Sequence, residues 1–310
     1  MFTPELIKAK SAHDAWEQLY ASIKKNGKLV EARGELTKEI LNPVVEITNP
    51  YDRITRSRSF DLPFILQEAF DILNENQPRS LHSKEMLEKT MGTSNNIMFF
   101  GNEMRQACSK WSLVKLKNVL EADKNTRKAI LDLGSRRPAV HYPCLIYFHL
   151  IIRENKLCAS LETRSTSLFF GLPNDIFFFT LLQQLMLGWL KETYPELEMG
   201  TFLYKTTSCH YYCDKAGNPF ANSGTHDNEY LYFDSKKCDL SYKDYIAEMG
   251  RLYFYVDQIF KAQPLEDIDA GVITTNNDVL YPLRDMFQSS FFYSWANELM
   301  SAKFKFPGKK

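Results

Sequence analysis

A cysteine that could act as a nucleophile stands directly after a proline in the stretch RRPAVHYPCLIYFHLII (136–152). Residues Leu145 to Ile152 form a nearly continuous apolar run, which is typical of a strand covered on both faces. Proline lacks the backbone N–H of a central strand position, so it marks a strand's first residue, a bulge or an edge. Cys144 would then lie where the sheet ends and its thiol could reach a ligand. The alternative is a buried cysteine that only fills space in the core.

Two further stretches carry polar groups that suit an anionic or hydrogen-bonding ligand. In TRSTS (163–167), the guanidinium of Arg164 and the hydroxyl of Ser165 could together hold a phosphate, although a surface ion pair is the simpler alternative. In PND (173–175), Asp175 lies at the expected start of a helix, where its alternative role is an N-cap. Taken singly, neither stretch predicts a site.

The stretch SCHYYC (208–213) contains three residues that could bind a metal, Cys209, His210 and Cys213. A structural zinc site needs four ligands, and the sequence has no second Cys/His pair at finger spacing. The sequence therefore predicts no metal site. It also lacks the glycine-rich motifs of P-loop and dinucleotide-binding proteins, and the G-x-S-x-G motif of serine hydrolases.

The elements that must position these groups follow one another without a regular repeat, which favours a mixed α/β fold in one domain. Apolar residues at three- and four-residue spacing predict helices over 4–25, 61–76 and 174–194. Short apolar or alternating runs predict strands within 28–50 and over 145–152, 157–165 and 201–212. Residues 112–133 are expected to form a helix, a turn and a strand, and GLP (171–173) is expected to break the chain.

Composition narrows the class of protein. The 310 residues contain 38 Lys plus Arg and 38 Asp plus Glu, and this neutral balance argues against nucleic acid as a partner. The most apolar region, 168–190, is interrupted by polar residues, so we expect no membrane span. Six sparse cysteines and an N-terminus without an apolar core favour a cytoplasmic protein with free thiols. The basic tail 304–310 is expected to fray.

The order of these stretches resembles the thymidylate synthase superfamily, which includes thymidylate synthases and the deoxycytidylate and cytidylate 5-hydroxymethylases. The shared order is Pro-Cys, a hairpin ending in Arg-Ser, G-L-P followed by an acidic or amide residue, and His-x-Tyr. The resemblance spans residues 28–215, is most specific in RSTSLFFGLPND (164–175), and in TNPYDRI (48–54) is closer to the hydroxymethylase branch. It implies a thymidylate-synthase-like mixed sheet flanked by helices, with residues 1–310 as a single catalytic domain.

The resemblance implies that Cys144 adds to C6 of a pyrimidine nucleotide, which makes C5 nucleophilic toward a one-carbon unit from 5,10-methylenetetrahydrofolate. A neighbouring cation is expected to lower the pKa of the thiol. Glu68 in ILQEAFDIL matches the family's helix glutamate, which organises water and proton transfer at the base. Its apolar neighbours could raise its pKa, whereas the sequence alone would favour a solvated helix glutamate.

The family's phosphate clamp also maps onto this sequence. Arg33 in EARGEL and the Arg164–Ser165 pair match the residues from one subunit. Arg127 and Lys128 in NTRKAIL match two basic residues that reach across from the other subunit. The resemblance therefore implies a homodimer whose phosphate sites are shared between the two chains.

The remaining contacts of the family map onto the sequence with some changes. His210 and Tyr212 match the pair that hydrogen-bonds the sugar hydroxyl. Ser167 and Gly171 fall where the folate binds, but Ser167 replaces an aspartate that contacts the pterin, so folate is expected to bind differently. Phe100 stands where synthases carry a tyrosine near the nucleophile.

Asp175 is the change that bears on the substrate. Synthases place an asparagine there for uracil, whereas a carboxylate can accept from the 4-amino group of cytosine and, when protonated, complement N3. The sequence therefore predicts that CMP or dCMP is converted to its 5-hydroxymethyl derivative with methylenetetrahydrofolate and water. The alternatives that stay open are synthase-like C5 methylation and a non-catalytic nucleotide-binding homologue, and the sugar is not determined.

Overall fold

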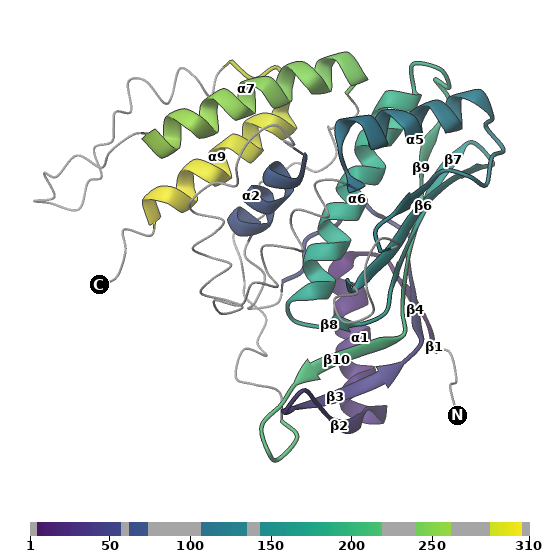
Figure 1. The fold of residues 1–310 in the computed structure, drawn as a ribbon, viewed down its shortest axis with the longest axis vertical. Coiled ribbons are helices and arrows are strands. Elements are labelled where there is room, and N and C mark those ends of the chain that lie inside the picture. Colours follow the sequence, from purple (N-terminus) through teal and green to yellow (C-terminus); the bar gives the residue numbers. More distant parts are fainter. Residues whose placement is uncertain are drawn as a thin grey trace, which may run out of the picture.

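A mixed α/β structure with two mixed sheets is formed by the described part of the chain (Figure 1). The structure is a computed structural model and describes residues 5–56, 62–73, 107–134, 143–218, 240–261 and 286–305. Within these ranges, none of the helices is both long and apolar enough to cross a membrane. The mixed α/β class predicted from the sequence is confirmed.

The larger sheet has six strands in the order β1-β4-β9-β7-β6-β5. Their bounds are β1 Glu5–Ala9, β4 Pro43–Ile47, β9 Glu198–Thr206, β7 Lys156–Thr163, β6 Leu145–Arg153 and β5 Ile130–Asp132. The smaller sheet has the order β2-β3-β10-β8, with β2 Lys28–Ala32, β3 Glu35–Leu41, β10 Ser208–Tyr212 and β8 Thr166–Ser167. The helices are α1 Ala12–Asn26, α2 Leu62–Leu73, α5 Lys110–Ala122, α6 Gly171–Leu190, α7 Tyr242–Lys261 and α9 Ser290–Lys305.

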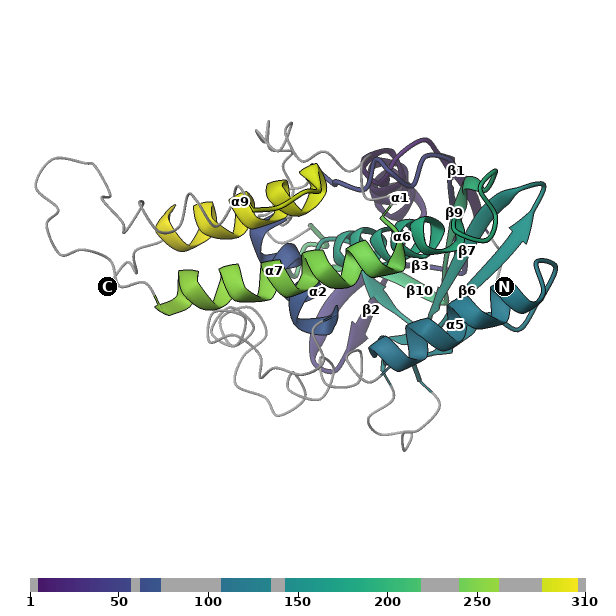
Figure 2. The same cartoon turned by 90° about the horizontal axis from the view of Figure 1, so that it is seen from above.

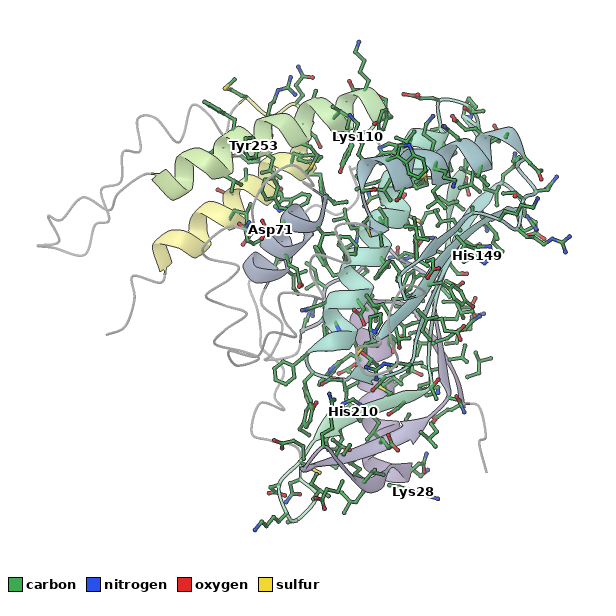
Figure 3. All side chains as sticks on the ribbon, viewed as in Figure 1. Lys28, Asp71, Lys110, His149, His210 and Tyr253 are labelled. Carbon is green, nitrogen blue, oxygen red and sulfur yellow. The ribbon has the colours of Figure 1, made fainter. Side chains whose placement is uncertain are left out.

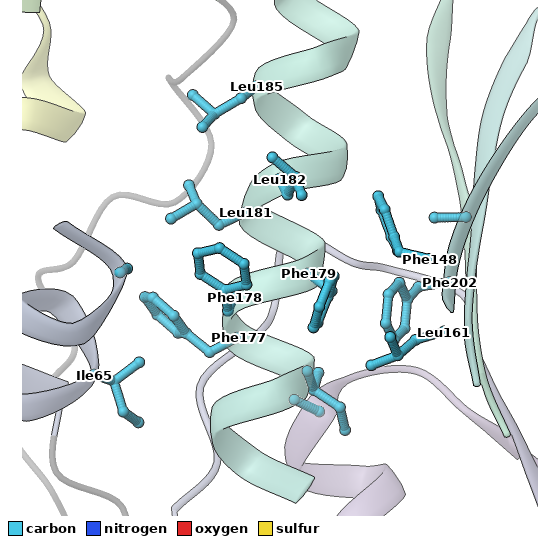
Figure 4. Packing of buried hydrophobic residues seen from close by; sticks show 14 of the residues in the cluster. Ile65, Phe148, Leu161, Phe177, Phe178, Phe179, Leu181, Leu182, Leu185 and Phe202 are labelled. Atoms are coloured by element: carbon cyan, nitrogen blue, oxygen red, sulfur yellow. The ribbon is translucent and has the colours of Figure 1, made fainter. Parts of the chain in front are cut away.

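Helix α6 lies at the centre of the molecule, between the large sheet and a group formed by α2, α7 and α9 (Figures 1 and 2). From the sheet, Phe148 and Phe202 point toward one side of α6, while Ile65 of α2 lies against Phe177 on the other side (Figure 4). A helix that is packed on all sides needs apolar residues all round rather than one stripe. This packing explains the continuous apolar run that predicted the helix.

A bulge between β7 and β9 decides which residues of β9 face α6. The parallel pairing runs from Leu157 opposite Met199 to Ala159 opposite Phe202, so β9 has one extra residue. Beyond the bulge, the buried residues of the two strands lie opposite one another. The fully buried side chain of Gln183 on α6 donates to the carbonyl oxygen of Leu157 (2.8 Å) at this point. A polar residue on an apolar helix therefore satisfies backbone at an irregularity in the sheet.

The first predicted helix begins later than its apolar spacing indicated. Residues Glu5–Ala9 form β1, which pairs in parallel with β4. Helix α1 begins only at Ala12, because Ser11 is its N-cap and accepts from the backbone N–H of Asp14 (3.1 Å). The prediction of helix over 4–25 was therefore wrong for Glu5–Ala9. In this short segment the buried residues Ile7 and Ala9 alternate with exposed ones, which also suits a strand.

Two other predicted boundaries differ from the structure. The expected strand 201–212 is two strands, because the chain leaves the large sheet after Thr206 and enters the small sheet at Ser208. The GLP stretch does not break the chain, since α6 begins at Gly171 and a proline in the first turn has no N–H to satisfy.

The strands of 28–50 and 145–165, the helix near 61–76 and the helix, turn and strand of 112–133 are confirmed. Of the tail 304–310, residues 306–310 lie outside the described ranges.

We expect Gly200→Ala to lower the free energy of unfolding by about 1–3 kcal/mol, measured by denaturant titration. A Cβ at Gly200 would lie 2.5 Å from Sγ of Cys158 and 2.8 Å from the carbonyl oxygen of Leu157, so the bulge would have to open. Gly250→Ala is the matched control: the residue is within α7, and beyond its own helix backbone and chain neighbours no atom of the described residues lies within 4 Å of that Cβ. This control should gain roughly 0.5–1 kcal/mol. Equal effects of the two changes would contradict the close approach.

Candidate active site

Cys144 lies at the edge of the large sheet, one residue before β6, and is exposed. The pairing of β6 with β7 is irregular between Leu145 and Tyr147, so a bulge follows directly after the cysteine. Arg164 holds this segment through two hydrogen bonds: its backbone N–H donates to the carbonyl oxygen of Cys144 (2.8 Å), and its Nε donates to that of Pro143 (3.0 Å). The hairpin therefore brings the Arg164 guanidinium to the thiol, as the sequence predicted.

The expected effect of a neighbouring cation on the pKa of Cys144 is confirmed, but burial outweighs it. Burial raises the pKa of the thiol above its ordinary value of 9.0, and the nearby Asp175 raises it further. The cations Arg164 and Arg33 lower it, but they do not outweigh the burial. A side chain can be exposed at one surface and still lose solvation from the protein packed around it. The thiol form of Cys144 is therefore favoured at neutral pH in the protein by itself.

Asp175 does not cap its helix. It is the fifth residue of α6, whose N-cap is Phe170, so the N-cap interpretation is excluded. The Tyr204 hydroxyl from β9 donates to Oδ2 of Asp175 (2.8 Å). Burial raises the pKa of Asp175 to about 7, and the neighbouring Glu68 also raises it, while the hydrogen bond from Tyr204 lowers it. Asp175 can therefore gain or lose a proton near neutral pH.

Glu68 reaches the same group of residues from a different element. It lies on α2, which packs against α6, and its side chain is half-buried. Its charge acts on Asp175, and the charge of Asp175 acts on Cys144. The solvated helix glutamate that the sequence alone favoured therefore does not describe this residue, because it faces a second carboxyl group.

Arg33 lies at the tip of the hairpin between β2 and β3, far from Cys144 in sequence. Arg33 and Gly34 both have positive φ, 56° and 80°, and join Ala32 directly opposite Glu35. Such a two-residue hairpin turn needs positive φ at both positions, which an arginine rarely adopts. The exposed Arg33 side chain is close enough to act on the thiol of Cys144.

His210 and Tyr212 project from β10 in the small sheet. Their rings meet edge to face with centroids 5.4 Å apart. Burial lowers the pKa of His210, with the charge of Glu39 raising it and that of Arg33 lowering it. His210 therefore belongs to the group around Arg33 and is expected to be neutral near pH 7.

The residues after Arg164 turn from the large sheet into α6. Ser165 is half-buried, and β8 pairs with β10 so that Ser167 lies opposite His210. Trp16 of α1 fixes the following residue by donating its Nε1–H to the carbonyl oxygen of Leu168 (3.0 Å). The segment that carries the RSTS residues is thus held by both a sheet and a helix.

Arg127 and Lys128 lie away from this group within one chain. Both are exposed between α5 and β5, and the backbone of Arg127 contacts the side chain of His149. His149 is five residues beyond Cys144 along β6, about 16 Å at the rise of a strand. Figure 3 shows His149 and His210 in different regions of the molecule. The chain therefore does not bring Arg127 and Lys128 to its own Cys144.

Tyr204 is the residue of this group that the sequence analysis missed. It is fully buried, and it alternates with the buried Phe202 and Thr206 along β9. A tyrosine in the buried phase of a strand indicates a hydroxyl with an internal partner, and this signal was present. The partner was not, because 29 residues separate Tyr204 from Asp175.

The potential metal ligands do not gather. The described ranges contain no group of three or more His, Cys, Asp or Glu residues that could hold a metal. Cys209 and Cys213 are buried, and the thiol of Cys213 donates to the carbonyl oxygen of Leu36 (3.4 Å). Phe100, which was expected near the nucleophile, lies outside the described residues.

Comparison with known proteins finds a distant and partial similarity. A thymidylate synthase from Vesicomyosocius okutanii subsp. Calyptogena okutanii (strain HA) is 29% identical to the chain over 107 residues. The matched segment covers 33% of this chain and 39% of that synthase, so it spans less than half of either protein. No family model matches the chain. The similarity extends to the thymidylate synthase superfamily at most.

We expect Cys144 to react with iodoacetamide with a pH midpoint above 9.0, because burial raises the pKa of its thiol. Asp175→Asn should move the midpoint to lower pH by removing a negative charge, and Arg164→Gln should move it to higher pH. Peptide mapping by mass spectrometry separates Cys144 from the other cysteines. A midpoint that stays in place in both variants would contradict the electrostatic contact among these three side chains.

Proposed function

We propose that the protein is a cytidine 5′-monophosphate 5-hydroxymethylase related to the thymidylate synthases. It would act on CMP or dCMP with methylenetetrahydrofolate and water. The observation that carries the proposal is the convergence of Cys144, Arg164 and Asp175 from three separate segments of the chain. A nucleophile, a cation and a titratable acid in electrostatic contact are what pyrimidine activation needs.

The chemistry proposed for Cys144 is addition to C6 of the pyrimidine. The sulfur forms a bond to C6 while the electrons of the C5–C6 double bond move to C5, which then becomes nucleophilic. C5 can take a proton from solvent and give back its original hydrogen, after which the C6–S bond breaks and the thiolate is restored. This exchange needs only nucleotide and protein. Because the pKa of the free thiol is raised, its proton must leave when the nucleotide is bound.

Asp175 is the residue proposed to read cytosine. A carboxylate accepts from the 4-amino group of cytosine, whereas a carboxylic acid donates to N3. Because the pKa of Asp175 is about 7, both forms are available near neutral pH. Uracil presents an oxygen at C4, which a carboxylate cannot accept from, so the ionised form of Asp175 disfavours uracil. Asp175 therefore favours cytosine over uracil in this proposal.

The nucleotide's phosphate and sugar are assigned to different residues of the group around Cys144. Arg33, Arg164 and Ser165 would hold the phosphate, because both guanidinium groups act on the thiol and can donate in pairs to phosphate oxygens. His210 and Tyr212 would hold the sugar hydroxyl. A neutral His210 offers one donor and one acceptor, which suits a hydroxyl group.

The proposed partner is a second copy of the chain. Helices α1, α5 and α6 lie on one face of the large sheet, and no helix of the described residues covers the other face (Figures 1 and 2). That face carries exposed or half-buried apolar residues, among them Leu6, Ile130 and Leu203. A homodimer through this face would bury them and bring Arg127 and Lys128 to the neighbouring site.

The folate donor is proposed from the resemblance alone. Oγ of Ser167 is buried and offers no accessible contact, and a Cβ at Gly171 would lie 2.9 Å from Oγ1 of Thr166, so this glycine serves local packing. Neither observation gives folate a polar contact, so the donor rests on the resemblance. Synthase-like methylation and nucleotide binding without catalysis remain the alternative functions.

Asp175→Asn should reverse the base preference. An amide cannot become a carboxylate that accepts from the 4-amino group, but it matches the O4 and N3–H edge of uracil. We expect the variant to lose cytidylate activity, by up to about 10⁴-fold, and to gain measurable activity on uridylate. The measurement is tritium release from 5-labelled dCMP and dUMP, with and without methylenetetrahydrofolate.

Cys144→Ser is the control for this experiment, because it should bind nucleotide but release no tritium. Near-normal release by that variant would remove the proposed nucleophile. A wild-type preference for uridylate, or an unchanged base ratio in Asp175→Asn, would contradict the cytidylate assignment. Binding of both nucleotides without any release would favour the non-catalytic alternative.

Complementation tests the shared site. A Cys144→Ser chain and an Arg127→Glu chain should each be inactive, and an equal mixture should recover roughly a quarter of wild-type activity. Half of the dimers would be mixed, and each mixed dimer would contain one whole site. Native mass spectrometry would establish that mixed dimers form. Their formation without recovered activity would count against Arg127 acting across the interface.

A further inference from the structure

Tyr204 makes a directed contact with Asp175 that the proposed function has not used. Its hydroxyl lies 2.8 Å from Oδ2 of Asp175, and the complete burial of Tyr204 strengthens the contact, while Asp175 is half-buried. A Cβ at Gly171 would lie 4.0 Å from the same oxygen. Oδ2 is therefore the inner oxygen, directed toward β9 and the start of α6.

The other oxygen of Asp175 is in a different position. Asp175 is half-buried, and Oδ2 is the oxygen that Tyr204 holds. We therefore assign Oδ1 as the oxygen that faces a ligand. The two oxygens of one carboxyl group have unequal surroundings.

The direction of the contact follows from the chemistry of the acceptor. An ionised carboxylate can only accept, so the Tyr204 O–H donates to Oδ2 of Asp175. Burial and the charge of Asp175 raise the pKa of the Tyr204 phenol, while the neighbouring hydroxyls of Thr163 and Thr166 lower it. Neither threonine hydroxyl makes a hydrogen bond among the described residues.

Building on the proposed function, we propose that Tyr204 is a positioning residue that determines base specificity. By donating to Oδ2 it stabilises the ionised form of Asp175, in which Oδ1, the oxygen assigned to the base, accepts from the 4-amino group of cytosine. Without the hydroxyl, the carboxyl group would hold its proton more readily and could rotate. The acid would then discriminate poorly between the 4-amino group of cytosine and the 4-oxygen of uracil.

Tyr204→Phe tests this role because it removes the hydroxyl and keeps the ring in the core. The readout is the ratio of dissociation constants for dCMP and dUMP, measured by calorimetry. We expect the preference for dCMP to shrink by about tenfold, the scale of one hydrogen bond to a charged group. Tyr194→Phe is the matched control: its hydroxyl donates to the carbonyl oxygen of Glu121 (2.9 Å) beyond the far end of α6, so the ratio should not change.

A double variant separates positioning from general packing. In the Asp175→Asn background, Tyr204→Phe should leave the base ratio unchanged, because the group on which it acts is gone. A purely structural role would weaken binding of both nucleotides equally and would persist in that background. Equal weakening of dCMP and dUMP binding by Tyr204→Phe, or an effect of Tyr204→Phe that persists in the Asp175→Asn background, would overturn the proposal.

A second variant keeps the test decisive if Tyr204→Phe does not fold. Thr166→Val removes one hydroxyl beside Tyr204 with little change of shape, and it should shift the base ratio in the same direction by a smaller factor. An unchanged ratio in a folded Thr166→Val protein would then count against the proposal. If Asp175→Asn itself leaves the ratio unchanged, the cytidylate assignment fails. If Asp175→Asn changes the base ratio but the Tyr204 and Thr166 variants do not, this inference fails and the cytidylate assignment stands.

Discussion

The burial of α6 on all sides beyond its first turns is the constraint on which the arrangement of the other elements depends. The helix packs against strands of both sheets and against α1, α2, α5 and α7, so each of these elements is positioned relative to one axis. Burial on all sides requires that every polar group on the helix has an internal partner or a function. Gln183 satisfies the carbonyl oxygen of Leu157 at the bulge, and Gln184 accepts from Arg53 (2.6 Å). Asp175, in the half-buried first turns of the helix, accepts from Tyr204.

This constraint explains how residues far apart in sequence come to act on one another. The bulge between β7 and β9 places Tyr204 on the helix-facing side of the sheet, and α2 brings Glu68 to the other side of Asp175. Two carboxyl groups and a phenol then share a region with little water. Because like charges and burial both disfavour ionisation, the pKa of Asp175 rises to about 7 and the group becomes sensitive to what binds beside it.

The reactivity of Cys144 depends on the same balance. Arg164 is fixed beside the thiol by hydrogen bonds to the backbone of Pro143 and Cys144, so its charge cannot move away. Burial and the charge of Asp175 nevertheless keep the pKa of the thiol raised. Protonation of Asp175 removes one of these opposing effects. The nucleophile and the base-reading acid of the proposed enzyme are thus electrostatically coupled, and a change at one changes the protonation of the other.

The sequence determined the features that depend on local patterns. The proline before Cys144 and the apolar run after it predicted a thiol at a strand's edge, and the spacing of apolar residues predicted α6 and the hairpin that carries Arg164. The tertiary structure decided what depends on long-range packing. It showed that Asp175 does not cap α6, that Tyr204 is its partner and that the pKa of Cys144 is raised rather than lowered. The physical reason is that periodicity and turn chemistry act between near neighbours, whereas desolvation and charge proximity depend on segments that the fold alone brings together.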